Sequence, residues 1–213
     1  MASLAKWPVP FFTARLQSRP RWLFACLGPL TCFILHWLSF FVLGRKTLTA
    51  LICAMPSNAQ MLASYRQWIP VSSLLGSVVY MLLPFLGVLM LVCVDVLRSE
   101  GRNYARLVEL ACLAFYFLLP FLISMLWLSL VFVPPRPVVG ADYSSYDLFE
   151  IVRDYRSSVQ MTLTINLIRV LELAFQACAA ILVVAAYRAF CHCSGSLAFL
   201  LTFGLVVLFL TVS

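Results

Sequence analysis

The sequence predicts an all-α, polytopic membrane protein with five transmembrane helices and short amphipathic interfacial helices. Of its 213 residues, 63% are hydrophobic and only 11% are charged, whereas soluble domains have roughly 25% charged residues. The hydrophobic residues gather in five segments close to the length of about 20 residues that crosses a bilayer as a helix. The basic residues, which give a net charge of +7, lie mostly at the ends of these segments and form no long run.

We treat the chain, residues 1–213, as a single membrane domain. The fifth segment is short for a bilayer, but no charged residue interrupts it. The predicted spans cover about residues 22–43, 71–97, 107–133, 163–187 and 197–212.

The segment before the first span, residues 1–21, is predicted to be a cytoplasmic amphipathic lead-in. It is basic, has no acidic residue and contains serine, which also fits a mitochondrial targeting sequence. Pro8, Pro10 and Pro20 weaken a long targeting helix, so a retained segment is favoured.

The two long connections are predicted to contain short helices. Residues 44–69 fit a short helix lying at the membrane interface, followed by a turn. In the connection 134–159, four apolar or aromatic residues recur at helical spacing: Leu148, Ile151, Val152 and Tyr155. This second connection therefore predicts an amphipathic helix that lies on the membrane or over the bundle.

Two spans are predicted to be kinked, because Pro84 and Pro120 lie inside them. Each proline removes a backbone donor, and a membrane helix tolerates this when a neighbouring helix satisfies the freed carbonyl group. Tyr116 places a hydroxyl group one turn before the second proline. A kink that serves packing is favoured over a gating hinge.

The distribution of Lys and Arg predicts the orientation. The side with the N-terminus carries eight of them outside the spans, and the opposite side carries six. The eight lie in short segments next to spans, which are the segments that determine topology. We expect a cytoplasmic N-terminus and a C-terminus outside or in a lumen, in a bacterial inner membrane in preference to an organelle membrane.

The fourth span contains one polar face, within the stretch NLIRVLELAFQ. Asn166, Arg169, Glu172 and Gln176 are spaced by three, three and four residues, which places them on one side of a helix. A charge at the bilayer centre costs about 2.5–3.5 kcal/mol, although Arg169 could reach the headgroups and could pair with Glu172. Three interpretations stay open: internal packing that satisfies kinked backbone, contact with another membrane protein or a second copy, and a substrate or proton pathway.

No catalytic, metal or cofactor site is predicted. Cys191 and Cys193 are too few for a structural zinc site, which needs four ligands, but they lie next to the membrane and are possible acylation sites. Common enzyme and nucleic-acid motifs are absent from the sequence. We expect a non-enzymatic protein surrounded by membrane lipids, with no nucleic-acid partner; the sequence names no small-molecule substrate.

Three stretches resemble one family in their order and spacing. They are PFFTARLQSRPRWLFACL before the first span, ACLAFYFLLPFLIS with Tyr116 and Pro120, and YRAFCHCSGSLAFLLTFGLVVLF at the end. Over nearly its whole length the chain resembles the Yip (Ypt/Rab-interacting protein) domain family, in its prokaryotic branch. The family's glycine-rich fourth span is replaced here by LAFQACAAILVV.

The resemblance implies a non-enzymatic, five-span membrane protein with a cytoplasmic N-terminus. Eukaryotic members of the family are linked to vesicle trafficking and Rab GTPases, but few residues precede the first span here, so a GTPase partner is not carried over. The favoured function is an intramembrane interaction or scaffold component. The alternatives are a small transporter or channel component that uses Arg169 and Glu172, and an accessory subunit of a larger membrane complex.

Overall fold

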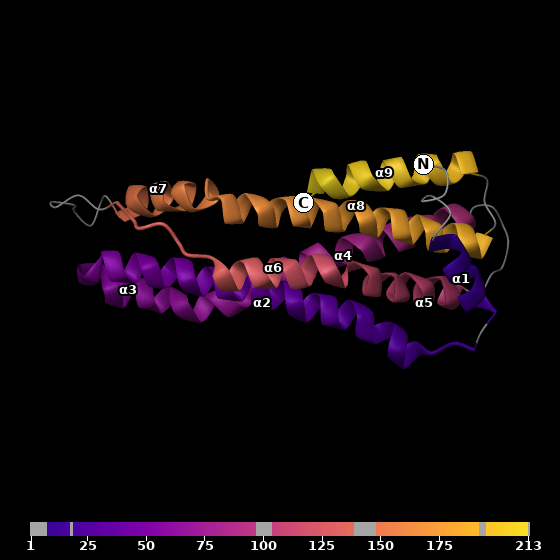
Figure 1. Ribbon diagram of the computed structural model, residues 1–213, viewed down its shortest axis with the longest axis horizontal. Helices are drawn as coiled ribbons and strands as arrows, with labels where there is room; N and C mark the ends of the chain where they lie inside the picture. Colours follow the sequence, from indigo (N-terminus) through magenta and orange to yellow (C-terminus); the bar gives the residue numbers. More distant parts are fainter. Residues whose placement is uncertain (1–7, 18, 97–103, 139–147, 192–194, 213) are drawn as a thin grey trace. The chain divides into compact units, whose positions relative to one another are not determined.

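The described part of the protein is helical. The computed structural model describes residues 8–17, 19–96, 104–138, 148–191 and 195–212 (Figure 1). No β-strand occurs among these residues. The predicted all-α fold class is therefore confirmed.

Nine α-helices and three short 3-10 helices make up the described residues. The 3-10 helices are η2 (Pro56–Asn58), η3 (Tyr65–Gln67) and η4 (Phe115–Leu118). The α-helices are α1 (Pro8–Leu16), α2 (Trp22–Ala54), α3 (Ala59–Ser64), α4 (Trp68–Val96), α5 (Tyr104–Ala114), α6 (Leu119–Val131), α7 (Leu148–Gln160), α8 (Leu163–Cys191) and α9 (Gly195–Val212).

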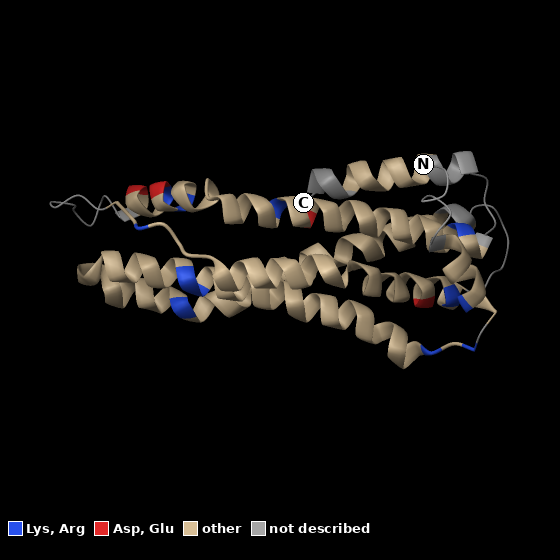
Figure 2. Cartoon of the chain, in the orientation of Figure 1, with Lys and Arg blue, Asp and Glu red and all other residues tan. Residues whose placement is uncertain are grey.

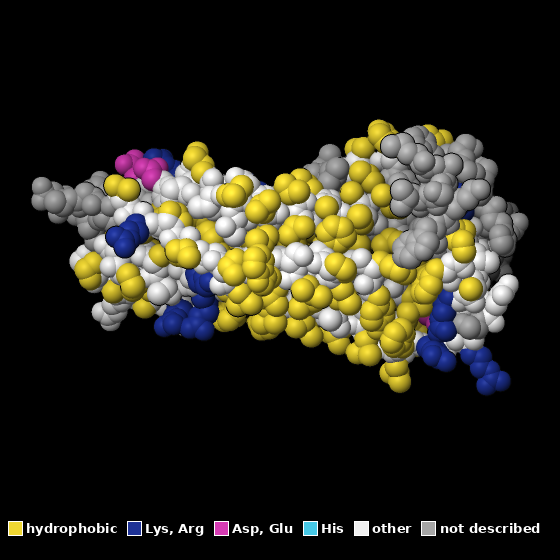
Figure 3. All heavy atoms as spheres, viewed as in Figure 1, with side chains coloured by type: hydrophobic (Ala, Val, Ile, Leu, Met, Phe, Trp, Pro, Cys, Tyr) yellow, Lys and Arg dark blue, Asp and Glu magenta, His cyan; other side chains and the backbone are white. Residues whose placement is uncertain are grey.

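Four helical stretches are long and apolar enough to cross a membrane: Trp22–Ala54, Pro56–Cys93, Tyr104–Val131 and Leu163–Phe190. The long helices carry few charged residues (Figure 2), and many of their hydrophobic side chains lie on the surface (Figure 3). The chain is thus an all-α, multi-pass membrane protein. The predicted fifth span corresponds to α9, an 18-residue helix, and its membrane crossing stays a prediction.

Helix α2 is longer than the first predicted span. Its 33 residues extend about 50 Å at 1.5 Å per residue, whereas the hydrocarbon core is about 30 Å thick. The Thr47 and Thr49 hydroxyl groups donate to carbonyl groups one turn earlier, at 3.0 and 2.7 Å, and are thereby satisfied within the helix. The short interfacial helix expected from residue 44 onward is therefore a continuation of α2, and the chain turns back only at η2 and α3.

Gly44 does not end α2, although glycine is a poor helix former. A Cβ atom at this position would lie 2.9 Å from Cγ2 of Ile69. The absent side chain thus lets α2 and α4 approach each other closely, and this contact explains why glycine is tolerated inside the helix.

The chain divides into two compact units, and each of the long helices α2, α4 and α8 contributes to both. The first unit comprises Met1–Ile34, Val78–Phe121 and Glu172–Ser213, and the second comprises Leu35–Ser77 and Leu122–Leu171.

In the first unit, α2 packs closely against α5 and η4. A Cβ atom on Gly28 would lie 2.8 Å from the backbone oxygen of Cys112, so only glycine fits this contact. The Tyr116 ring stacks on Phe24 with ring centroids 4.9 Å apart, and its hydroxyl group donates to the Phe24 oxygen at 2.7 Å. Tyr116 therefore bonds to a neighbouring helix and anchors α2.

The third predicted span is interrupted directly before Pro120. Helix α5 ends at Ala114, the 3-10 helix η4 follows, and Pro120 is the second residue of α6. A proline in the first turn of a helix removes no intrahelical hydrogen bond, because N–H groups there have no partner within the helix. The break thus lies before the proline, and the proline itself fits the start of a new helix.

The second unit contains a core formed by α2, α3 and α7. Leu51, Met55, Leu62 and Tyr155 are buried together in it. The predicted amphipathic helix of the second long connection is α7, and its Ile151 packs against this core. Tyr155 donates to the Thr47 oxygen at 3.3 Å, and burial raises the pKa of its hydroxyl group to about 12.

Candidate functional site

The four residues of the predicted polar face lie on α8 in different environments. Asn166 and Arg169 are exposed, Glu172 is half-buried and Gln176 is completely buried. The first two belong to the second unit and the last two belong to the first. The face therefore has an exposed outer part, Asn166 and Arg169, and a more buried inner part, Glu172 and Gln176.

The inner part satisfies a carbonyl group that Pro84 leaves without its usual partner. In a regular helix the Tyr80 oxygen would accept from the N–H of residue 84, but proline has no N–H. The Gln176 Nε2 group donates to this oxygen at 3.2 Å instead. The predicted kink position in α4 is thus matched by a polar side chain from α8.

A second hydrogen bond joins the same two helices in the opposite direction. The Tyr80 hydroxyl group donates to the backbone oxygen of Glu172 at 3.0 Å, and the Tyr80 and Phe175 rings lie 5.3 Å apart. We call Tyr80, Pro84, Glu172 and Gln176 the α4–α8 clasp. Its members are held by backbone groups, which fits the packing interpretation for this part of the face.

The orientation of the Gln176 amide follows from the same contact. A reversed amide would place its oxygen against the Tyr80 oxygen, and two acceptors cannot share a hydrogen bond. Within the described residues, the Gln176 Oε1 atom is buried without a hydrogen-bond partner. The Gln176 amide therefore contributes its N–H donor to the contact with α4, while its oxygen is buried away from water.

We predict that Gln176→Leu lowers the free energy of unfolding by about 1–2 kcal/mol, because it leaves the Tyr80 carbonyl group without a donor. The cost should be smaller in a Pro84→Ala background, where the new N–H at position 84 can donate to Tyr80. The measurement is unfolding in mixed micelles, followed by circular dichroism, of the wild type, the two single variants and the double variant. The four free energies of unfolding give the coupling energy between positions 84 and 176. Asn166→Leu, an exposed change on the same helix, is the control. An equal cost of Gln176→Leu in both backgrounds would contradict the assignment.

The outer part of the face belongs to the second unit. Neither the Asn166 nor the Arg169 side chain makes a hydrogen bond or an ion pair with another residue that the structure describes. Exposed apolar side chains lie on either side of them. We call this surface the α8 outer face; it consists of Leu163, Asn166, Leu167, Arg169 and Val170.

A buried carboxylate that the sequence analysis did not single out lies in α5 of the first unit. Glu109 is 1% exposed. Its Oε1 atom accepts from the Arg21 backbone N–H at 2.9 Å and from the Arg15 guanidinium group at 3.3 Å. Arg106 donates to Oε2 and, through its other terminal nitrogen, to the Leu16 oxygen at 3.0 Å.

The Glu109 cluster, formed by Arg15, Arg21, Arg106 and Glu109, attaches the lead-in to α5. It binds the last turn of α1 and the residue before α2. A signal for it was present in the sequence, because Glu109 is the only acidic residue of its predicted span and follows Arg106 by three residues. The partners from the lead-in could not be read from that spacing.

The possible acylation sites are not described. Cys191 is the last residue of α8, but its side chain lies outside the described residues, as does Cys193 entirely. Among the side chains that are described, no group of three or more His, Cys, Asp and Glu is arranged to hold a metal ion.

Comparison of the chain with protein-family models, curated proteins and solved structures gives no match. The fold nevertheless defines the class, which is a helical membrane protein with four helical stretches able to span a bilayer. The polar features of its described residues are the α8 outer face, the α4–α8 clasp and the Glu109 cluster.

Proposed function

We propose that this chain is a non-enzymatic interaction or scaffold component that binds another membrane protein through the α8 outer face. The observation that carries the proposal is that Arg169 and Asn166 are exposed on a membrane-spanning helix without partners among the described residues. Polar groups inside a bilayer are costly and usually face protein. A second membrane helix would supply the missing contact.

The depth of the two side chains supports this reading. Arg169 lies six residues after the start of α8, which is about 9 Å along the helix. Its long side chain can reach the headgroups from there. Asn166 lies closer to the start of α8, three residues after it, but its short side chain stays at that depth. A partner helix that offers a carboxylate or carbonyl oxygen at this depth would satisfy both.

The charge of Arg169 favours a different protein over a second copy. A two-fold dimer through this face would bring equivalent residues of the two chains together, because such an interface is isologous. Two guanidinium groups would then approach each other inside the membrane. A partner with an acidic or carbonyl acceptor avoids that repulsion.

The resemblance to the Yip domain family points to the same class of function. We further propose the orientation that the basic residues favour, with a cytoplasmic N-terminus in a bacterial inner membrane. The Glu109 cluster supports this orientation, because it holds the side chains of Arg15 and Arg106 beside the N-terminal segment.

Photo-crosslinking in intact native membranes tests the proposal. A photoreactive residue at Val170, on the α8 outer face, should form a stoichiometric product with one other protein. The same residue at Ile123, an exposed apolar position of α6, is the matched control and should label lipid only. Arg169→Leu should lower the Val170 product by about tenfold, because one charged hydrogen bond is lost.

Two results would contradict the proposal. Equal protein labelling from Val170 and Ile123 would mean that the α8 outer face has no specific partner. A product of twice the chain mass from Val170, with no other protein, would replace the heterologous partner with a second copy.

A further inference from the structure

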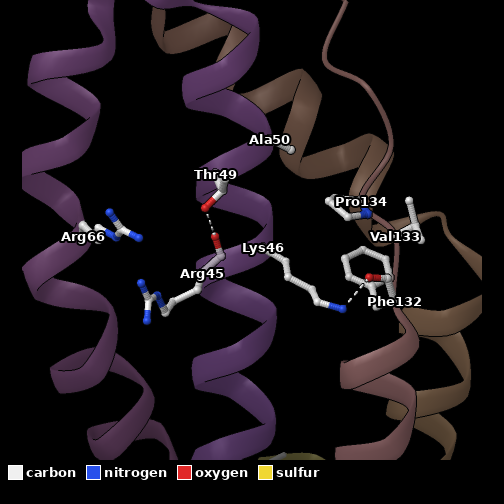
Figure 4. A pocket seen from close by; sticks show the side chains of 8 residues that line it. All are labelled: Arg45, Lys46, Thr49, Ala50, Arg66, Phe132, Val133 and Pro134. Carbon is white, nitrogen blue, oxygen red and sulfur yellow. Dashed lines mark hydrogen bonds between the residues drawn. The ribbon is translucent and has the colours of Figure 1, made fainter.

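The second unit contains a basic cavity that the proposed function does not use. It measures about 400 Å³ and is lined by parts of α2 and η3 and by the segment that follows α6 (Figure 4). Its lining includes Arg45, Lys46, Arg66, Phe132, Val133 and Pro134. Three of its lining residues are cationic, and none of the described lining residues is acidic.

The two arginines present unused donors to this space. Figure 4 shows the guanidinium groups of Arg45 and Arg66 lying near each other, although they come from different helices. Neither side chain forms a hydrogen bond or an ion pair with the residues that the structure describes. Arg45 lies over the Phe41 ring at 5.5 Å, a contact that uses the face of the guanidinium group and leaves its N–H edges open.

Lys46 holds the opposite wall of the cavity. Its Nζ atom donates to the Leu130 oxygen at 2.5 Å and to the Phe132 oxygen at 2.9 Å, where α6 ends. These bonds use two of the three donors of the ammonium group. The two bonds fix the charge in position, on the other side of α2 from the two guanidinium groups (Figure 4).

The surroundings of the cavity belong to the end of a membrane span. The long apolar run of α2 is interrupted at Arg45 and Lys46, and α6 ends at Val131. Tyr65 and Trp68, which flank Arg66, are 56% and 61% exposed. Exposed Tyr and Trp at helix ends are typical of the headgroup level of a membrane, so the cationic groups lie where phosphate groups of lipids are found.

We propose that this cavity binds a phosphate group, held by the guanidinium groups of Arg45 and Arg66. Arginine donates two parallel hydrogen bonds to phosphate oxygens, and a bound anion removes the repulsion between the two neighbouring cations. Basic pockets at the ends of membrane helices bind the headgroups of anionic lipids in this way. The phosphate can belong to a lipid headgroup or to a soluble ion, and both present the same oxygens.

The test uses the full chain purified in a neutral detergent. Native mass spectrometry measures how much phosphatidylglycerol and phosphatidylcholine of equal chain length remain bound. We expect a preference for phosphatidylglycerol that falls about 25-fold in Arg45→Gln/Arg66→Gln, since each cation near a headgroup contributes a factor of about five. The control Arg153→Gln removes one positive charge from α7, as Arg66→Gln alone does from the cavity, and should keep the preference. Arg153 lies 3.8 Å from Glu150 and 3.6 Å from Asp154.

A second arm separates the two sources of phosphate. Inorganic phosphate without lipid should raise the melting temperature of the wild-type chain, and not that of the double variant, if the ligand is soluble. Lipid retention without this rise assigns the site to a headgroup. The proposal is overturned when the double variant and the wild type retain equal phosphatidylglycerol and phosphate changes neither melting temperature. If the double variant does not fold, Arg66→Gln alone replaces it, with an expected loss of about fivefold.

Discussion

Glu109→Ala is expected to lower the free energy of unfolding by about 3 kcal/mol. The variant removes the carboxylate to which Arg15, Arg106 and the Arg21 backbone N–H all donate. Removing one member of a buried charged pair costs about 3–5 kcal/mol. The two guanidinium groups are 17% and 18% exposed, so they keep part of their hydration and the lower end of that range applies.

The measurement is equilibrium unfolding in mixed micelles, with tryptic cleavage after Arg15 as a second readout. Cleavage should become faster, because the last turn of α1 is attached to α5 through this cluster. Glu150→Gln is the matched control: Glu150 is 69% exposed, lies 3.8 Å from Arg153, and should cost less than about 0.5 kcal/mol. Equal costs for the two variants would show that the Glu109 cluster does not stabilise the lead-in.

Gly28→Val is expected to cost about 3 kcal/mol or more, and Gly28→Ala about 1–3 kcal/mol. Even the Cβ atom of alanine would lie 2.8 Å from the Cys112 backbone oxygen and 3.1 Å from the Tyr116 ring. The backbone oxygen belongs to α5 and cannot turn aside as a flexible side chain can. Relief of the clash therefore requires α2 and α5 to separate, which also weakens the contact of Tyr116 with Phe24.

Thermal unfolding of the two Gly28 variants checks this ranking. Gly76→Ala is the control, because a Cβ atom there meets nothing within 4 Å, and alanine is the better helix former by up to about 1 kcal/mol. The Gly76 variant should be as stable as the wild type or slightly more stable. A Gly28→Ala variant that is equally stable would mean that the close approach of α2 and α5 is not required.

The positions of the long helices could be predicted because hydrophobic length depends only on local sequence. The predicted and observed ranges differ most for α2, which continues to Ala54. Composition predicts where an apolar span ends, whereas the end of a helix depends on its backbone hydrogen bonds, which continue in α2 to Ala54. Helix α2 is therefore longer than the membrane span predicted from its hydrophobic residues.

The spacing of the polar residues on α8 placed all four on one side of the helix, but it could not separate buried from exposed members. Gln176 is buried because α4 supplies an acceptor at Tyr80, and the reason for that acceptor is Pro84. Pro84 and Gln176 can both be seen in the sequence, but the sequence does not show that they lie close together in space. The role of Glu109 could not be predicted either, because two of its donors, Arg15 and the Arg21 backbone N–H, are distant from it in the sequence.

The α4–α8 clasp also sets an order for the biosynthesis of this chain. Gln176 follows Tyr80 by 96 residues, and a ribosome that adds about 5–20 residues per second needs about 5–20 s to make them. During that interval the Tyr80 carbonyl group has no donor from α8, a state that is costly in lipid. We therefore expect the nascent α4 to stay in contact with water or with the insertion machinery until α8 has been made. Through Pro84, the release of α4 into the lipid would then depend on the synthesis of α8.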